Sequence, residues 1–192
     1  MSNKILPAFV AAGAVAFGFA QVAQAKSPVP GKPGKANIVE IASAVNADSG
    51  EFEYLLAAAQ CDYFEGAVVE LLTGKDKLTL FAPTDAAFEA LQRKLGVANP
   101  SPEITCTLPQ ATVFNILAYH VTDGRRFSNS VFNKRSTKMI EMLNGQYIVT
   151  NPDLTITDNS GDPEKTINAV KGLVNINASN GVIHVIDGVL EP

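Results

Sequence analysis

The sequence predicts an α+β fold with a mainly antiparallel sheet, and the order of its local patterns is the reason. Helical patterns dominate from Asn37 to about Val121, and strand patterns dominate from there to the C-terminus. Helices followed by strands, without a β-α-β alternation, are typical of α+β proteins. The length of 192 residues and the hydrophobic content of 46% fit one globular domain, or one domain with an extension.

The first half of the folded region is predicted to be mostly helical. In chain order, the expected elements are a helix from residue 38, helices at 52–59 and 63–72, a strand at 78–82, and helices at 86–95 and 108–118. The first helix has apolar residues at positions i, i+3, i+4 and i+7. Asp48 and Glu51 resemble a capping box for the second helix. The strand is a short apolar run that stops at Pro83, after which Thr84 or Asp85 can cap the next helix.

The second half is predicted to form a series of short strands. In chain order, these strands are expected at 136–143, 146–150, 154–157, 166–170, 173–176 and 182–186. The first two flank Asn144 and Gly145, which both tolerate the positive φ of a type I′ turn, so we expect a hairpin there. The segment 182–186 is apolar on both faces and is therefore expected inside a sheet.

The first 25 residues have the pattern of a secretory signal peptide. Lys4 is the only charge, an apolar run follows at 8–20, and the segment ends in Ala23, Gln24 and Ala25. A membrane anchor is the alternative, because the uncharged run approaches the length that spans a bilayer. The Ala-rich core and the glutamines near its end favour the signal peptide. We expect cleavage before Lys26 and a protein that is periplasmic, secreted or at the cell surface.

Residues 26–36 are rich in Pro, Gly and Lys and are predicted to be a flexible tether, which leaves a folded domain at 37–192. The net charge of −4 provides no overall positive field, so nucleic-acid binding is not expected. No membrane insertion is expected after the signal peptide is removed.

Three segments, at 79–88, 115–121 and 180–192, carry a family resemblance. They resemble the two signature segments and the intervening Tyr-His motif of the fasciclin (FAS1) family. The order and spacing are similar to those of one complete domain that starts near Asn37. The resemblance implies a FAS1-like fold, with an N-terminal helix cluster packed on a wedge of β-strands, and a role in adhesion rather than catalysis. The signature residues expected to define the fold are Thr79, Phe81, Pro83, Thr84, Asp85, Phe88, Asn180, Gly181, His184 and Asp187.

Both histidines lie on apolar faces. His120 ends an apolar helical stripe, and His184 shares a strand face with Val182 and Ile186. Such positions favour a buried, hydrogen-bonded imidazole over an exposed base or ligand. Tyr119 lies beside His120 and is expected to point elsewhere. The Tyr-His motif is linked to integrin binding in animal members of the family, so the resemblance makes Tyr119 and His120 candidate interaction residues.

No catalytic or cofactor motif is present. The chain lacks G-x-S-x-G, and its two cysteines and two histidines lack the short paired spacings of structural zinc sites. We therefore expect no enzymatic activity, no metal and no cofactor. Because an exported protein with two cysteines more often pairs them, we expect a disulfide between Cys61 and Cys106. Such a pair departs from the general pattern of fasciclin domains.

Five basic residues cluster after the Tyr-His motif: Arg125, Arg126, Lys134, Arg135 and Lys138. They are either an ordinary solvated surface or a docking patch for an acidic partner or glycan. The leading hypothesis is an exported, non-catalytic adhesion module that binds a protein or a surface polysaccharide. The alternative is a periplasmic carrier that holds a small apolar ligand between helices and sheet. A hydrolase is a distant third.

Overall fold

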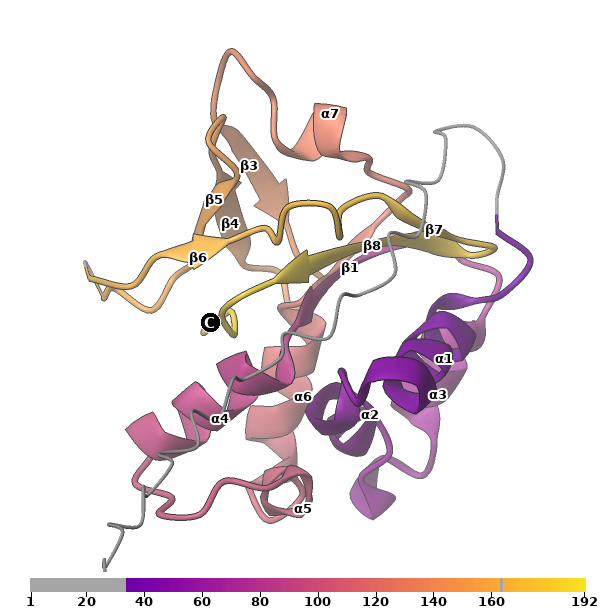
Figure 1. Cartoon of the computed structure of the whole chain (residues 1–192), viewed down its shortest axis with the longest axis vertical. Coiled ribbons are helices and arrows are strands. Elements are labelled where there is room, and N and C mark those ends of the chain that lie inside the picture. The colour runs from indigo at the N-terminus through magenta and orange to yellow at the C-terminus, as the bar shows by residue number, and fades with distance from the viewer. Residues whose placement is uncertain (1–33, 163) are drawn as a thin grey trace, which may run out of the picture.

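The computed structural model describes residues 34–162 and 164–192, so the expected signal peptide and most of the expected tether lie outside the described residues. Within them, a cluster of helices lies on one side of a central sheet, and a second sheet lies on the other side (Figure 1). This is the α+β architecture predicted from the sequence. Ala36 accepts a hydrogen bond of 2.8 Å from the Ser179 N–H, so the last residue of the expected tether contacts the domain.

The helices of this cluster are α1 (Ile38–Ser49), α2 (Glu53–Ala59), the 3-10 turn η1 (Asp62–Phe64), α3 (Ala67–Thr73), α4 (Asp85–Lys94), α5 (Pro102–Thr105) and α6 (Gln110–Ala118). The expected helix at 63–72 is wrong in its first part. Glu65 and Gly66 have φ angles of 50° and 82°, and this left-handed pair separates η1 from α3. Single-turn helices such as α5 are too short to show an apolar period, so the sequence did not predict it.

The capping box expected from Asp48 and Glu51 is also wrong. Asp48 lies inside α1, whose own start carries a capping box made by Asn37 and Glu40. There the Asn37 Oδ1 accepts from the Glu40 N–H at 2.9 Å, and the Glu40 Oε2 accepts from the Asn37 N–H at 2.7 Å. Phe52 occupies the N-cap position of α2 in a left-handed conformation and provides no side-chain cap.

The cap of α2 comes from the start of a different helix. The Asp85 carboxylate accepts from the N–H groups of Glu53 and Tyr54 at 3.2 and 3.1 Å. Glu51 returns the contact, because its carboxylate accepts from the Asp85 N–H at 3.3 Å. Thr84 caps α4 itself, since its hydroxyl accepts from the Ala87 N–H at 3.3 Å. Asp85 therefore fixes α2 against α4. Its carboxylate binds the unpaired N–H groups at the start of α2, although it belongs to another helix.

The central sheet has the strand order β2-β1-β8-β7. Its strands are β1 (Leu78–Pro83), β2 (Val121–Asp123), β7 (Ile176–Ala178) and β8 (Gly181–Ile186). β1 pairs with β8 in parallel, whereas β2 and β7 pair antiparallel on the outside. Every residue of β1 and β8 is buried, as the apolar run at 182–186 predicted. The strand expected at 173–176 begins only at Ile176, because Asn175 has a φ of 63° and turns the chain.

The second sheet is antiparallel throughout and consists of β3 (Lys138–Glu141), β4 (Tyr147–Thr150), β5 (Thr155–Thr157) and β6 (Ile167–Asn168) in that order. The hairpin between β3 and β4 is confirmed, but its turn type differs from the prediction. Of Asn144 and Gly145, only Gly145 has a positive φ, of 80°. Its N–H donates to the Met142 carbonyl at 2.9 Å, and the Met142 N–H donates to the Gln146 carbonyl at 2.8 Å. This geometry is a three-residue loop with Gly in the left-handed position.

The described residues form two hydrophobic cores, one on each face of the central sheet. Side chains alternate along a strand, so Leu80 of β1 faces the helices while Phe81 faces the second sheet. Ile148 and Ile156 complete the second core from β4 and β5. Helix α7 (Ser128–Val131) closes this side (Figure 1), and its Val131 is fully buried.

Cys61 and Cys106 form the expected disulfide, with their Cα atoms 5.4 Å apart. Cys61 follows α2 and Cys106 follows α5, so the bond fastens the outer end of the helix cluster. The cysteines are separated by 45 positions, which makes the bond a constraint on a long loop of the unfolded chain.

The double variant Cys61→Ser/Cys106→Ser should therefore lower the free energy of unfolding by up to about 4 kcal/mol, since loop-closure entropy is restored to the unfolded chain. Urea denaturation at neutral pH measures this change. Wild type under reducing conditions serves as the matched control and should unfold like the variant. Thiol titration of denatured, unreduced wild type should detect no free thiol; finding two would contradict the bond.

Candidate functional site

The first signature segment is built into the fold. The Thr79 hydroxyl donates to the Gly124 carbonyl at 2.7 Å and accepts from the Arg126 N–H at 2.8 Å. Phe81 is fully buried in the second core. Phe88 is buried on α4 and its ring stacks on that of Tyr54, with centroids 5.9 Å apart. With Pro83 ending β1 and the caps from Thr84 and Asp85, the segment is a strand-to-helix junction.

Asn180 connects three elements through one buried amide. Its Oδ1 accepts from the Ile38 N–H at 3.0 Å, at the start of α1. Its Nδ2 donates to the carbonyls of Leu72 at 2.7 Å and Gly74 at 3.2 Å, at the end of α3. These backbone groups have no partner within their own helices, so the amide satisfies both helix ends at once.

Gly181 and Asp187 have equally local roles at the two ends of β8. A Cβ atom on Gly181 would lie 2.4 Å from the Leu78 carbonyl oxygen, so only glycine allows this approach of β8 to β1. The Asp187 carboxylate accepts from the backbone N–H and the side-chain amide of Asn168 at 2.6 and 2.9 Å. It thereby anchors β6 rather than serving a reacting group.

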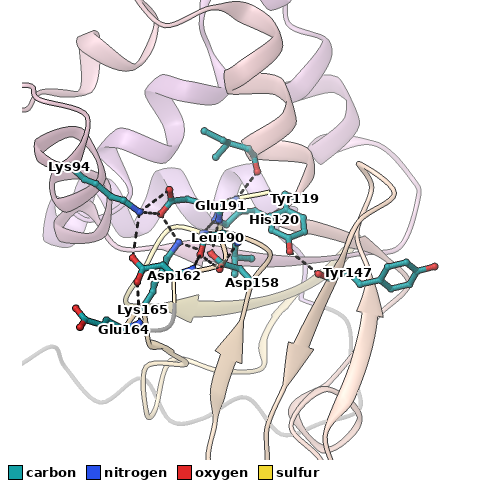
Figure 2. Close-up of polar contacts among 12 residues, drawn as sticks. Lys94, Tyr119, His120, Tyr147, Asp158, Asp162, Glu164, Lys165, Leu190 and Glu191 are labelled. Carbon is teal, nitrogen blue, oxygen red and sulfur yellow. Dashed lines mark hydrogen bonds and ion pairs between the residues drawn. The ribbon is translucent and has the colours of Figure 1, made fainter.

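His120 and Tyr119 are both buried, as the apolar helical stripe predicted for His120. The His120 Nδ1 lies 2.7 Å from the Ile116 carbonyl oxygen, and its Nε2 accepts from the Leu190 N–H at 2.9 Å (Figure 2). The Tyr119 hydroxyl donates to the Tyr147 carbonyl at 2.7 Å. Both side chains are 1% exposed or less, so neither is presented to a partner in this structure.

His184 is enclosed in the same way on β8. Its Nε2 lies 2.8 Å from the Arg126 carbonyl oxygen, and its Nδ1 accepts from the Asn175 N–H at 3.4 Å. The ring lies between those of Phe81 and Phe132, with centroids 5.7 and 5.9 Å away. Like His120, it has one nitrogen that faces a carbonyl oxygen and one that accepts a backbone N–H, which defines a neutral imidazole.

This arrangement does not support a hydrolase built on either histidine. In both rings the two nitrogens are already bonded to backbone groups, whereas a general base needs one of them free to reach a nucleophile. The Asp187 carboxylate, which directly follows the strand that carries His184, is bonded to Asn168. The described residues contain no cluster of three or more His, Cys, Asp or Glu side chains arranged to hold a metal ion.

The five clustered basic residues separate into two groups. Arg125 is half-buried and donates from Nη1 to the Ala178 carbonyl at 2.9 Å and from Nη2 to the Asn177 side chain. Its guanidinium also lies over the ring of Phe127, 5.9 Å from the ring centre. Arg126 is exposed, but its Nε donates to the neighbouring Asp123 carbonyl at 2.9 Å. These two arginines brace the loop after β2.

Lys134, Arg135 and Lys138 form the second group, and all three are exposed. In the described part of the chain, none of their charged groups has a carboxylate within ion-pair distance. Lys134 and Arg135 line an open groove of about 580 Å³ beside α7. The remaining residues of this groove are Ser128, Asn129, Phe132, Asn133, Pro152 and Leu154. The structure thus assembles a basic groove that the sequence showed only as a run of charges.

A second polar cluster, around Asp158, was missed by sequence reasoning (Figure 2). The Asp158 carboxylate accepts from the Lys165 Nζ at 2.6 Å and from the Glu191 N–H at 2.8 Å. Lys165 also contacts the Glu191 carboxylate at 2.7 Å, and Lys94 of α4 contacts the same carboxylate at 3.1 Å. Burial raises the pKa of Asp158, but these hydrogen bonds outweigh it and the pKa is lowered overall. The cluster fastens the C-terminal segment to the loop at 158–165.

The hollow that is lined by α2, α4, α5 and α6 is much smaller than a ligand site. Its volume is about 20 Å³, whereas small-molecule sites usually have several hundred Å³. Its apolar lining includes Phe88, Leu91 and Val113. The space therefore does not fit the expected alternative of an apolar-ligand carrier at this position. In the described part of the chain, no helix has both the length and the apolar character needed to cross a bilayer.

Replacing Asn180 by alanine should lower the free energy of unfolding by about 2–4 kcal/mol, because the Ile38 N–H and the Leu72 carbonyl lose their buried partner. Urea denaturation at neutral pH measures the change. Asn159→Ala, at an exposed position, is the matched control and should change stability by less than about 0.5 kcal/mol. An equal stability of both variants would show that the buried amide is dispensable.

Stability should fall as the pH falls from about 6.5 to about 4. Burial lowers the pKa of His120 and of His184 from 6.5 to about 4, so in this window the unfolded chain binds protons that the folded chain cannot. The full loss is about 3 kcal/mol for each histidine. Asp158, with a pKa lowered from 3.8, adds a loss only at still lower pH.

Urea midpoints measured at intervals between pH 7.5 and 4.5 test this dependence. The decline should be about half as steep in a folded His184→Gln variant, because one of the two titrating groups is gone. A wild-type stability that does not change between pH 7 and pH 5 would contradict the neutral, buried state of both rings.

Comparison with known proteins places the chain in a family. The fasciclin domain model matches residues 58–192, which include everything from the end of α2 onward. A protein of Synechocystis sp. (strain ATCC 27184 / PCC 6803 / Kazusa), named "Uncharacterized protein sll1735", is 32% identical over 157 residues, which are 80% of this chain and 96% of the relative.

A FAS1 domain pair from the insect cell adhesion molecule Fasciclin I has a similar fold. The TM-score is 0.56 with 14% sequence identity, and the match covers 82% of this chain. This chain spans about half of that structure, 51% of its length. At this identity the likeness concerns the fold alone. Together with the match over residues 58–192, it shows that the chain belongs to the fasciclin domain family.

Proposed function

We propose that the protein is an exported, non-catalytic interaction module that binds a partner in the periplasm or at the cell surface. Fasciclin domains are generally adhesion-type modules, typically found outside the cell or at its surface. The proposal rests on which polar side chains are already bonded within the protein and which are not. Both histidines, Asp85, Asp158 and Asp187 bind groups of the protein itself, while Lys134, Arg135 and Lys138 remain exposed without a carboxylate partner in the described part of the chain.

Two features support export. The pattern of residues 1–25 is that of a signal peptide. The disulfide between Cys61 and Cys106 is a bond that persists in oxidising compartments and is rare in the cytosol. The two features are independent, because one concerns a targeting pattern and the other concerns the folded domain.

The partner is expected to be a protein or a surface polysaccharide. An adhesion surface needs exposed groups rather than an enclosed cavity, and the groove beside α7 is open with exposed cations at its rim. The hollow of about 20 Å³ in the helix cluster gives no support to a carrier of apolar ligands. The bonded state of both imidazoles gives none to a hydrolase.

Binding to the cell envelope tests this function. The labelled mature chain, residues 26–192, should bind washed envelope fragments of the producing organism saturably, and several-fold more weakly at high salt, because exposed charges are screened. Co-sedimentation measures the bound fraction. The same chain reduced and unfolded is the control and should not show saturable binding. A natively folded chain that does not bind saturably would refute an envelope-binding role.

A further inference from the structure

The groove beside α7 combines three kinds of surface. Lys134 and Arg135 supply positive charge, Asn129 and Asn133 supply amides, and Pro152 and Leu154 supply an apolar wall. Its volume of about 580 Å³ falls within the usual range of sites that hold small molecules or short chain segments. The other cavity described above is apolar and far smaller.

The polar groups of the groove are mainly hydrogen-bond donors. The Asn133 Oδ1 already accepts from the Arg135 N–H at 2.9 Å, which leaves its amide NH₂ as a donor. The Ser128 Oγ accepts from the Asn175 Nδ2 at 2.7 Å, which leaves its O–H to donate. The ammonium of Lys134 and the guanidinium of Arg135 donate only. A set of donors with two positive charges complements a ligand rich in acceptors and carrying negative charge.

The Asp153 carboxylate beside the wall forms no ion pair with Lys134 or Arg135 in the described part of the chain. Asp153 lies between Pro152 and Leu154, but its Oδ1 accepts from the N–H and the hydroxyl of Thr155 at 3.1 and 2.7 Å. These bonds lower the pKa of Asp153, so the group stays ionised and held in its own turn. The cations of the groove are therefore available to a ligand from outside.

The walls of the groove are held in place from the core. Asn175 accepts from the Ser128 N–H at 2.6 Å through its Oδ1 and donates to the Ser128 hydroxyl, so it fixes the start of α7 twice. Phe132 is buried against the ring of His184. Asn175 and Leu154 have φ angles of 63° and 73°, which are unusual for residues other than glycine. Strained residues persist where the surrounding structure holds them, and they are frequent at ligand sites.

We infer that this groove binds a segment of a carboxylated polysaccharide, a chain of uronic acid units; the inference rests on the proposed function and names its site and ligand class. Arg135 and Lys134 bind the carboxylates, the amide and hydroxyl donors bind ring hydroxyls, and the Pro152–Leu154 wall packs against the apolar face of a sugar ring. An acidic peptide that bound by adding a strand would need a free strand edge, and none of the named strands contributes to the groove lining.

The experiment measures binding of fluorescent polygalacturonate oligosaccharides to the mature chain by anisotropy. Lys134→Gln/Arg135→Gln should raise the Kd at least tenfold, because two charge-assisted contacts are lost. Lys75→Gln/Lys171→Gln removes two exposed charges elsewhere and is the matched control, with a Kd within twofold of wild type. Methyl-esterified oligosaccharides, which lack the negative charge, should bind at least tenfold more weakly.

Asn129→Ala separates sugar recognition from simple charge attraction. This exposed amide has no partner in the described part of the chain, so its loss should not disturb the fold. It should weaken polygalacturonate about threefold and leave the binding of polyglutamate, tested as the acidic peptide, unchanged.

Several outcomes would overturn the inference: no binding of polygalacturonate by wild type, equal binding of the esterified form, equal affinity of the Lys134/Arg135 variant, or preference for polyglutamate. The envelope assay keeps the two proposals apart. Envelope binding that survives in the Lys134/Arg135 variant would exclude this groove as the binding site, while the proposed interaction function would still hold. Absence of envelope binding by the wild-type protein would refute the proposed interaction function itself.

Discussion

The parallel pairing of β1 with β8 is the contact on which the rest of the structure depends. It joins the first strand of the described domain to the last one through a continuous register from Leu78 with Gly181 to Pro83 with Ile186. Both strands are buried on both faces, so this pair divides the interior into the helix-side core and the core of the second sheet. The elements packed on either face are positioned relative to this pair, which explains why the two signature segments of the family coincide with it.

The two histidines satisfy buried backbone groups in the interior around this strand pair. Each bridges backbone groups of separate segments: His120 binds Leu190, and His184 binds Arg126 and Asn175. An imidazole is suited to this because one ring nitrogen donates while the other accepts, so it satisfies two buried backbone groups at once. Because of these bonds, the ring nitrogens are not available to a binding partner. The family motif around His120 therefore serves the fold here.

Local patterns predicted those parts of the fold that depend on local chemistry. The apolar runs located β1 and β8, the Asn144-Gly145 pair located the hairpin, and apolar periodicity correctly predicted that His120 is buried. The failures mainly involve partners distant in sequence, a single backbone angle or, for α5, a helix of one turn. Asp85 looked like the cap of its own helix but caps α2. Arg125 looked like part of a surface patch but is held by the carbonyls of Ala178 and Ser179 at the end of β7. A run of charges shows composition, whereas only the folded chain shows which charges are already bonded.

The late position of β8 has a consequence for how the chain is made. During synthesis β1 emerges long before its parallel partner, and pairing requires closure of the long loop between them, which is a slow kind of contact to form. The nascent chain thus lacks its central sheet for most of translation. For a protein that we propose to be exported, the β1–β8 pair can therefore form only after the segment around residue 186 has crossed the membrane as well.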